Sequence, residues 1–180
     1  MKKLTFIFGM CLCISLQINS QNKRSEGKVI KDFGDTFSVE NAEIKTDINA
    51  DFKVIFDVSQ SSEDKSTPNK YIVTAARFLN MHANEGMKPE QLHVAMTIHG
   101  SAWQDVLNNE IYKEKYGVDN PNLKLINQLN DAGVDVIICG QTAVFRGMDR
   151  EDVNPNVKFA LSAMTALLQY QNNGYRFIKF

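Results

Sequence analysis

Residues 134–148 have the sequence Val-Asp-Val-Ile-Ile-Cys-Gly-Gln-Thr-Ala-Val-Phe-Arg-Gly-Met, and the predicted fold depends on this stretch more than on any other. Its first five residues are mostly β-branched and follow Gly133, a pattern typical of a short buried strand. Gly140 comes directly after Cys139 and allows both a sharp turn and a close approach of other backbone. The stretch therefore predicts a strand that places a thiol at its carboxyl end, where parallel sheets commonly carry their functional residues.

The composition is that of an ordinary globular protein. The chain has 180 residues, of which 43% are hydrophobic and 23% charged, and its formal net charge is −1. This size favours one domain, and the absence of any basic block argues against a nucleic-acid partner. The sequence contains neither G-x-G-x-x-G nor G-x-x-x-x-G-K-[ST], so we expect no nucleotide cofactor.

The first twenty residues are predicted to be a signal peptide. Lys2 and Lys3 precede an apolar run at residues 4–18, and Ser20 provides a small residue at a plausible cleavage point. The run is too short for a comfortable transmembrane helix of about 20 residues, although a retained anchor is the alternative. We therefore expect an exported protein, periplasmic or secreted from a bacterium, without stable membrane insertion after cleavage.

Cleavage would leave a single cysteine. Two of the three cysteines, Cys11 and Cys13, lie within the predicted signal peptide, so only Cys139 would remain. Loss of Lys2 and Lys3 would leave 18 basic residues against 21 acidic ones, a formal net charge of −3. A lone cysteine in an exported protein is buried, paired between chains, or used as a reactive thiol.

Strand and helix patterns alternate along the rest of the chain. Residues 21–51 are predicted to form a surface arm, with a short edge strand at 28–31. Strands are expected at 52–58, 92–98, 134–138 and 175–180, and helices begin at Thr67-Pro68, after Gly100, at Asn120-Pro121 and at Asn154-Pro155. This alternation predicts one α/β domain over residues 52–180, doubly wound and flavodoxin-like, with a mainly parallel sheet and helices on both faces.

The candidate site combines the thiol with a histidine. His99 and Cys139 each follow a predicted strand, so both are expected at the same edge of the sheet. The imidazole can then hold a thiolate or transfer a proton, or it can simply bond within its loop. Arg146 lies close by in sequence and is able to favour the thiolate or bind an anionic sulfur species, although a solvated arginine is the commoner case.

A metal site is not expected. His93 and His99 share one face of a strand, but six positions separate them by about 20 Å. Zinc ligands need bonds of about 2.1 Å, so these two side chains cannot hold one ion.

Five short segments together carry a family resemblance. They are Ala75-Ala76-Arg77-Phe78-Leu79-Asn80, Ile98-His99-Gly100, Asn120-Pro121-Asn122, Gly133-Val134-Asp135-Val136 leading into Cys139-Gly140-Gln141, and Gly174-Tyr175. On these segments the chain resembles the DsrE/DsrF-like sulfur-relay proteins, and most closely the exported DsrE family proteins. The resemblance implies a flavodoxin-like subunit that assembles into homo-oligomers, trimers or hexamers. It also implies a persulfide on Cys139, as some members carry on the aligned cysteine.

The first hypothesis is therefore an exported sulfur-handling protein, in which Cys139 binds or transfers sulfur. Under it His99 shuttles a proton or pairs with the thiolate, while Gln141, Asn80 and Gly140 shape the pocket. Because no second cysteine remains, transfer would involve a small sulfur species or a thiol-bearing partner protein. The alternatives are a non-catalytic anion-binding or assembly domain with a buried thiol, and a redox-sensing thiol. The sequence leaves open whether the protein is an enzyme.

Overall fold

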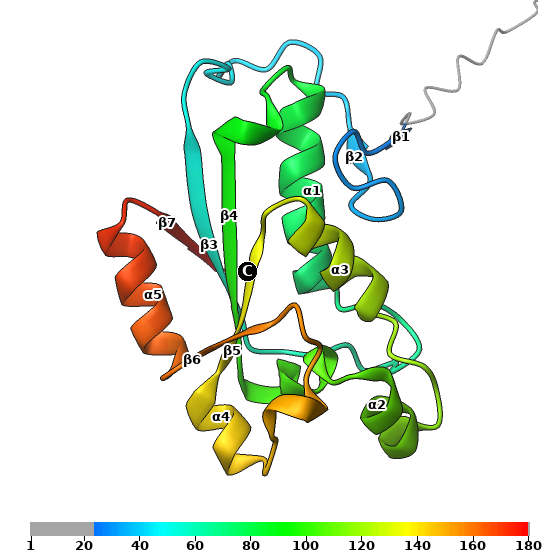
Figure 1. Ribbon diagram of the computed structural model, residues 1–180. Coiled ribbons are helices and arrows are strands. Elements are labelled where there is room, and N and C mark those ends of the chain that lie inside the picture. The colour runs from blue at the N-terminus through cyan, green and yellow to red at the C-terminus, as the bar shows by residue number, and fades with distance from the viewer. Residues whose placement is uncertain (1–23, 180) are drawn as a thin grey trace, which may run out of the picture.

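The computed structural model describes residues 24–179, and a five-stranded parallel sheet lies at its centre (Figure 1). The strand order is β6-β5-β4-β3-β7, and every neighbouring pair is parallel. The strands are β3 (Phe52–Val58), β4 (Leu92–Ile98), β5 (Asp135–Cys139), β6 (Lys158–Ala160) and β7 (Arg176–Lys179). The predicted α/β class with a parallel sheet is confirmed.

Helices cover both faces of this sheet, as the sequence predicts. The helices α1 (Lys70–Asn84) and α3 (Leu123–Asp131) pack on one face and α5 (Ala163–Asn172) on the other (Figure 1). Two shorter helices, α2 (Asn109–Tyr116) and α4 (Gly140–Phe145), lie beyond the carboxyl ends of the strands. Three 3₁₀ turns complete the domain: η1 (Pro89–Gln91), η2 (Gly100–Val106) and η3 (Arg150–Asp152).

The two faces of the sheet are packed very differently. Alternate residues of β4, including Val94, Met96 and Ile98, join the main hydrophobic core with α1 and α3. The opposite face carries Ile55 and Ile137 together with the smaller Ala95 and Thr97, and α5 buries only Ala163 and Ala166 among its own residues. As a result α5 lies close to the sheet while its larger apolar side chains remain exposed.

The structure corrects several predicted element boundaries, among them the helix expected at Asn120-Pro121, which begins at Leu123. The helix expected from Asn154-Pro155 begins only at Ala163, and residues 158–160 before it form the edge strand β6. The helix expected after Gly100 is split into η2 and α2, because Asn108 starts a new helix by accepting a hydrogen bond from the Ile111 N–H. The first helix is capped by Asn69, two residues after Thr67.

The described part of the N-terminal arm packs against α1. It forms a small antiparallel pair, β1 (Arg24–Ser25) with β2 (Thr36–Phe37), in place of the edge strand expected at 28–31. Ile30 enters the hydrophobic core and is 1% exposed. Within residues 24–179 no helix combines the length and apolarity needed to cross a bilayer. The predicted signal peptide, residues 1–20, lies outside the described residues.

Candidate functional site

Cys139 ends β5 and sits beside the first turns of two helices. The backbone N–H groups of Gln141 and Thr142, in α4, and of Ala163, the first residue of α5, are near enough to the thiol to lower its pKa. The Thr142 hydroxyl acts on the sulfur in the same direction. The first N–H groups of a helix have no partner within the helix and carry partial positive charge. The sulfur is therefore surrounded by donors that favour a negative charge.

These donors outweigh burial in setting the acidity of the thiol. Cys139 is only 6% exposed, and burial alone raises the pKa of a thiol because it disfavours the charged form. The hydrogen bonds from Thr142, Ala163 and Gln141 act in the opposite direction and leave the pKa of Cys139 below its ordinary value. The thiolate is the nucleophilic form, so the site favours the reactive state of a largely covered sulfur.

Gly140 allows the two chain segments around the thiol to approach each other. A Cβ atom at this position would lie 2.5 Å from the carbonyl oxygen of Ala160 and 3.2 Å from that of Leu161. Contacts below 3.0 Å to backbone atoms require the backbone to move. Gln141 also reaches this connection, since its Nε2 donates to the Leu161 carbonyl at 3.4 Å. Gly140 and Gln141 therefore lie beside the thiol, as the sequence analysis expects.

His99 lies next to Cys139 in the sheet but binds a different residue. The β4–β5 register pairs Ile98 with Ile138, so His99 and Cys139 follow at neighbouring positions. The His99 ring turns towards β3, where its Nε2 atom lies 2.7 Å from Asp57 Oδ1. Among the described residues no hydrogen bond joins His99 to the thiol. The structure thus places the two side chains on adjacent strands without the direct pair that the sequence suggests.

Asp57 is the functional group that the sequence analysis misses. Its side chain is 6% exposed, and three groups contact the carboxylate: His99, Lys179 Nζ at 2.9 Å and the Thr97 hydroxyl at 3.1 Å. Burial raises the pKa of Asp57, but the bonds from Lys179 and His99 outweigh it and hold the pKa below its ordinary value. The only sequence signal for Asp57 is that it is an acid within the apolar run at 52–58. This signal does not indicate which residues the carboxylate binds.

Two other predicted site residues lie away from the thiol. The Asn80 side chain is fully buried on α1, where it bonds to the arm at the Val29 and Ile30 N–H groups and the Ile30 carbonyl. Because α1 and Cys139 lie on opposite sides of the sheet, the assignment of Asn80 to the thiol pocket is corrected. Arg146 stacks on the rings of Trp103 and Phe145, 5.6 Å and 5.3 Å from their centroids.

A buried carboxylate at the carboxyl edge ties three loops together. Asp105 is 1% exposed and accepts hydrogen bonds from Ser61 Oγ at 2.8 Å and from Asn69 Nδ2 at 2.7 Å. Asn69 is also bonded to Asn122: the Asn69 N–H donates to Asn122 Oδ1 at 2.7 Å. Burial is the main cause that raises the pKa of Asp105 to about 6, against the lowering effect of these bonds. The network holds the loops in place at the edge where the thiol lies.

The protonation of Asp105 is expected to make stability depend on pH. Because its folded-state pKa is raised, the protonated carboxyl is stabilising below the unfolded pKa of about 4, and that contribution is lost as pH rises to about 6. The isosteric D105N variant removes this titration. The unfolding free energy of the wild type minus that of D105N should fall by about 2 kcal/mol from pH 4 to pH 7, measured by urea denaturation. An unchanged difference would contradict the raised pKa.

Within residues 24–179 no group of three or more His, Cys, Asp and Glu side chains is arranged to hold a metal ion. What the site offers is a thiol of lowered pKa, with a carboxylate–histidine pair on the neighbouring strands. It can form a nucleophilic thiolate, and it can bind a proton at the imidazole.

Fold and site together define a class: single-domain α/β proteins with one thiol at the carboxyl edge of a parallel sheet. The model of the DsrE/DsrF-like family matches residues 53–180, and the chain belongs to this family. The resemblance drawn from the five sequence segments is thereby confirmed. Comparison with curated proteins gives no match.

Two solved structures share the fold. One is a protein of unknown function, MTH1491 from Methanobacterium thermoautotrophicum, with 16% identity and a TM-score of 0.55; the match covers 72% of this chain and 100% of that one. The other is the ychN protein from E. coli, with 13% identity and a TM-score of 0.53, covering 72% of this chain and 99% of the other. At these identities the likeness extends to the fold alone.

Proposed function

We propose that this protein carries sulfane sulfur as a persulfide on Cys139. The observation that supports the proposal is the lowered pKa of Cys139, caused by the Thr142 hydroxyl and the backbone N–H groups of Thr142, Ala163 and Gln141. These groups favour the thiolate, which is the form that attacks a sulfane sulfur. Membership of the DsrE/DsrF-like family supports a sulfur-related role.

The loading step is a nucleophilic displacement at sulfur. The Cys139 thiolate attacks the sulfane sulfur of a donor such as thiosulfate, and a new sulfur–sulfur bond forms. The bond between the sulfane sulfur and the sulfonate group breaks, and sulfite leaves with the bonding electron pair. No external oxidant is required, because the transferred atom keeps its sulfane character. An incoming thiolate from a second molecule then takes the outer sulfur and restores Cys139.

His99 has a supporting role in this proposal. Its Nε2 atom is bonded to Asp57, so the ring is fixed beside the strand that ends in Cys139. A ring held in this way can supply or accept the proton of an approaching thiol donor or acceptor.

Exposure to thiosulfate or polysulfide is expected to add the mass of one sulfur atom to the purified protein. Intact-mass spectrometry should detect the adduct, and treatment with dithiothreitol should remove it. The variant C139S should show no adduct because it lacks the nucleophile. T142V, which loses one of the four donors, should form the adduct more slowly at neutral pH. Absence of an adduct with either donor would refute persulfide carriage.

A non-catalytic role for the thiol is the second candidate, and the 6% exposure of Cys139 favours it. The two roles differ in the pH dependence of alkylation. A carrier thiolate should react with iodoacetamide with a midpoint below the free-thiol pKa of about 8.5. A packed thiol should stay unreactive until the protein unfolds, and a redox sensor should form a disulfide-linked dimer on non-reducing gels.

We also propose that the protein is exported and self-associates. Export is supported by Lys2 and Lys3 before the apolar run at residues 4–18. Association is supported by exposed apolar side chains on α4 and at the start of α5: Val144, Phe145, Leu161, Met164 and Leu168. N-terminal sequencing of the protein from its native compartment should begin at Gln21. Sedimentation equilibrium should give a trimer or hexamer, whereas a monomer at micromolar concentration would contradict the assembly.

A further inference from the structure

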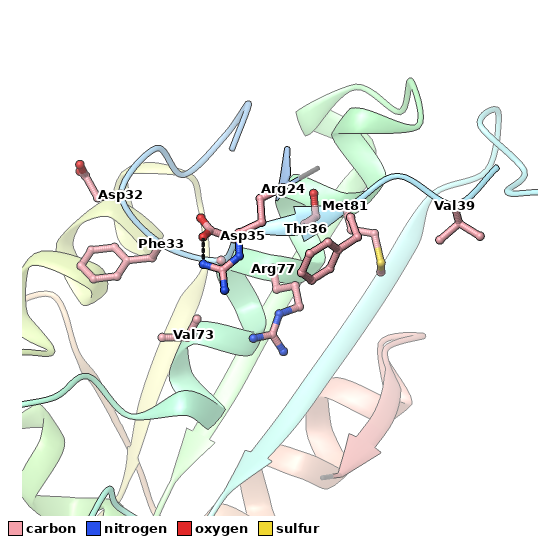
Figure 2. A pocket seen from close by; sticks show the side chains of 11 residues that line it. Arg24, Asp32, Phe33, Asp35, Thr36, Val39, Val73, Arg77 and Met81 are labelled. Atoms are coloured by element: carbon pink, nitrogen blue, oxygen red, sulfur yellow. Dashed lines mark hydrogen bonds and ion pairs between the residues drawn. The ribbon is translucent and has the colours of Figure 1, made fainter. Parts of the chain in front are cut away.

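A groove lies between the N-terminal arm and the outer side of α1, on the face of the sheet away from α5. Figure 2 shows this hollow, whose volume is about 670 Å³. Its apolar lining comes from both segments: Phe33, Phe37, Val39, Val73 and Met81. Cavities that bind small molecules commonly have volumes of about 300–1,000 Å³, so the size suits a small organic ligand.

The groove continues past this hollow along α1. Two neighbouring hollows of about 340 Å³ and 240 Å³ share Phe37 and Met81 with the first. These two side chains are 52% and 42% exposed, which is high for large apolar residues. The three hollows thus adjoin at Phe37 and Met81, and a row of adjoining hollows suits an extended chain better than a compact ring.

One cation of the main hollow lacks a counter-charge. Arg24 forms an ion pair with Asp35 at 3.1 Å, and Asp32 is paired with Lys124 at 3.2 Å. The Arg77 guanidinium has no hydrogen bond or ion pair with any residue between 24 and 179. Arg77 lies between Val73 and Met81 on the same side of α1, at helical spacing, and its exposed side chain lines the hollow with theirs (Figure 2).

We propose that this groove binds a single-chain amphipathic carboxylate such as a medium-chain fatty acid. The carboxylate pairs with the Arg77 guanidinium, which offers the planar two-donor geometry that carboxylates prefer. The hydrocarbon chain lies along Val73, Met81 and Phe37 and removes their apolar surface from water. This site is separate from Cys139 and does not depend on sulfur chemistry, since α1 and the thiol occupy opposite sides of the sheet.

Dodecanoate is the probe, and its binding to the purified protein is measured by isothermal titration calorimetry. Saturable binding at one site per chain is expected, with dodecanol binding about tenfold more weakly because it lacks the charge. R77Q should weaken dodecanoate about tenfold, and R77K should recover part of the loss. M81S should weaken dodecanoate and dodecanol alike, because it shortens the apolar wall.

R176Q is the matched control, since Arg176 is an exposed arginine on β7, far from the groove along the chain. It should bind dodecanoate as the wild type does, and circular dichroism should show that all variants are folded. Equal binding of dodecanoate and dodecanol, or unchanged binding by R77Q, would overturn the proposal. Binding only to vesicles of anionic lipid, and not to free dodecanoate, would also overturn it. C139S should bind normally, which separates this result from the fate of the persulfide proposal.

Discussion

Replacing Gly140 with alanine is expected to lower the unfolding free energy by about 1–3 kcal/mol and to raise the pKa of the Cys139 thiol. The added Cβ would lie 2.5 Å from the Ala160 carbonyl oxygen, and a backbone atom cannot rotate away. The connection from β6 to α5 must therefore shift. That connection leads directly to Ala163, whose N–H lowers the pKa of the thiol, so the shift weakens one of the interactions that favour the thiolate.

The measurement is the pH dependence of iodoacetamide alkylation, combined with urea denaturation. The wild type should give a lower alkylation midpoint than G140A. V144A is the control within the same helix, because Val144 is 79% exposed and its truncation should change stability by less than about 0.5 kcal/mol. Should G140A lose stability while the alkylation midpoint stays the same, the contribution of Ala163 to thiol acidity would be excluded.

Replacing Asn80 with alanine is expected to lower the unfolding free energy by about 3–5 kcal/mol and to release the arm from α1. The buried amide accepts from the Ile30 N–H at 2.9 Å and donates to the carbonyls of Ile30 at 2.8 Å and Phe33 at 2.9 Å. Without the amide these backbone groups either remain buried and unpaired, or reach water by detaching the arm. Both outcomes are costly, because detachment also exposes Ile30.

Limited proteolysis shows whether the arm has been released from α1 or remains packed on it. In N80A, cleavage within residues 24–51 should occur much faster than in the wild type, while residues 52–179 stay protected. The matched control is N84A on the next turn of α1, where the partly buried side chain donates to the Thr36 hydroxyl at 3.0 Å and, at a long 3.5 Å, to the Glu26 carbonyl. N84A should lower the unfolding free energy by about 1 kcal/mol. Equal protection of the arm in N80A and the wild type would contradict the anchoring role.

The order of strands and helices was predictable because its signals are local. Apolar runs bounded by polar residues or glycine mark β3, β4 and β5, and the alternation between strand and helix patterns implies the parallel sheet. The strand β6 was missed for the opposite reason. Val157, Leu161, Met164 and Leu168 follow a helical period, but β6 is a three-residue edge strand with little burial of its own. Strand pairing with β5, and not periodicity, determines its structure.

The candidate site was only partly predictable. The sequence predicts where the strand ends, and this places Cys139, Gly140 and Gln141 at the carboxyl edge of the sheet. The sequence does not predict the partner of His99, because its ring lies between the strands that carry Cys139 and Asp57. Only the three-dimensional structure shows that the ring binds Asp57, at 2.7 Å. Asn80 lies on a predictable helix, yet its partners are backbone groups some fifty residues away. Sequence patterns carry no information on such distant backbone contacts.

The two outer strands of the sheet have consequences for how copies of this protein can meet. β6 and β7 are three and four residues long, and they carry Lys158 and Lys179, whose ammonium groups are well exposed. Short, positively charged borders discourage another chain from adding a further strand. Growth into continuous ribbons or fibrils by strand addition is therefore disfavoured.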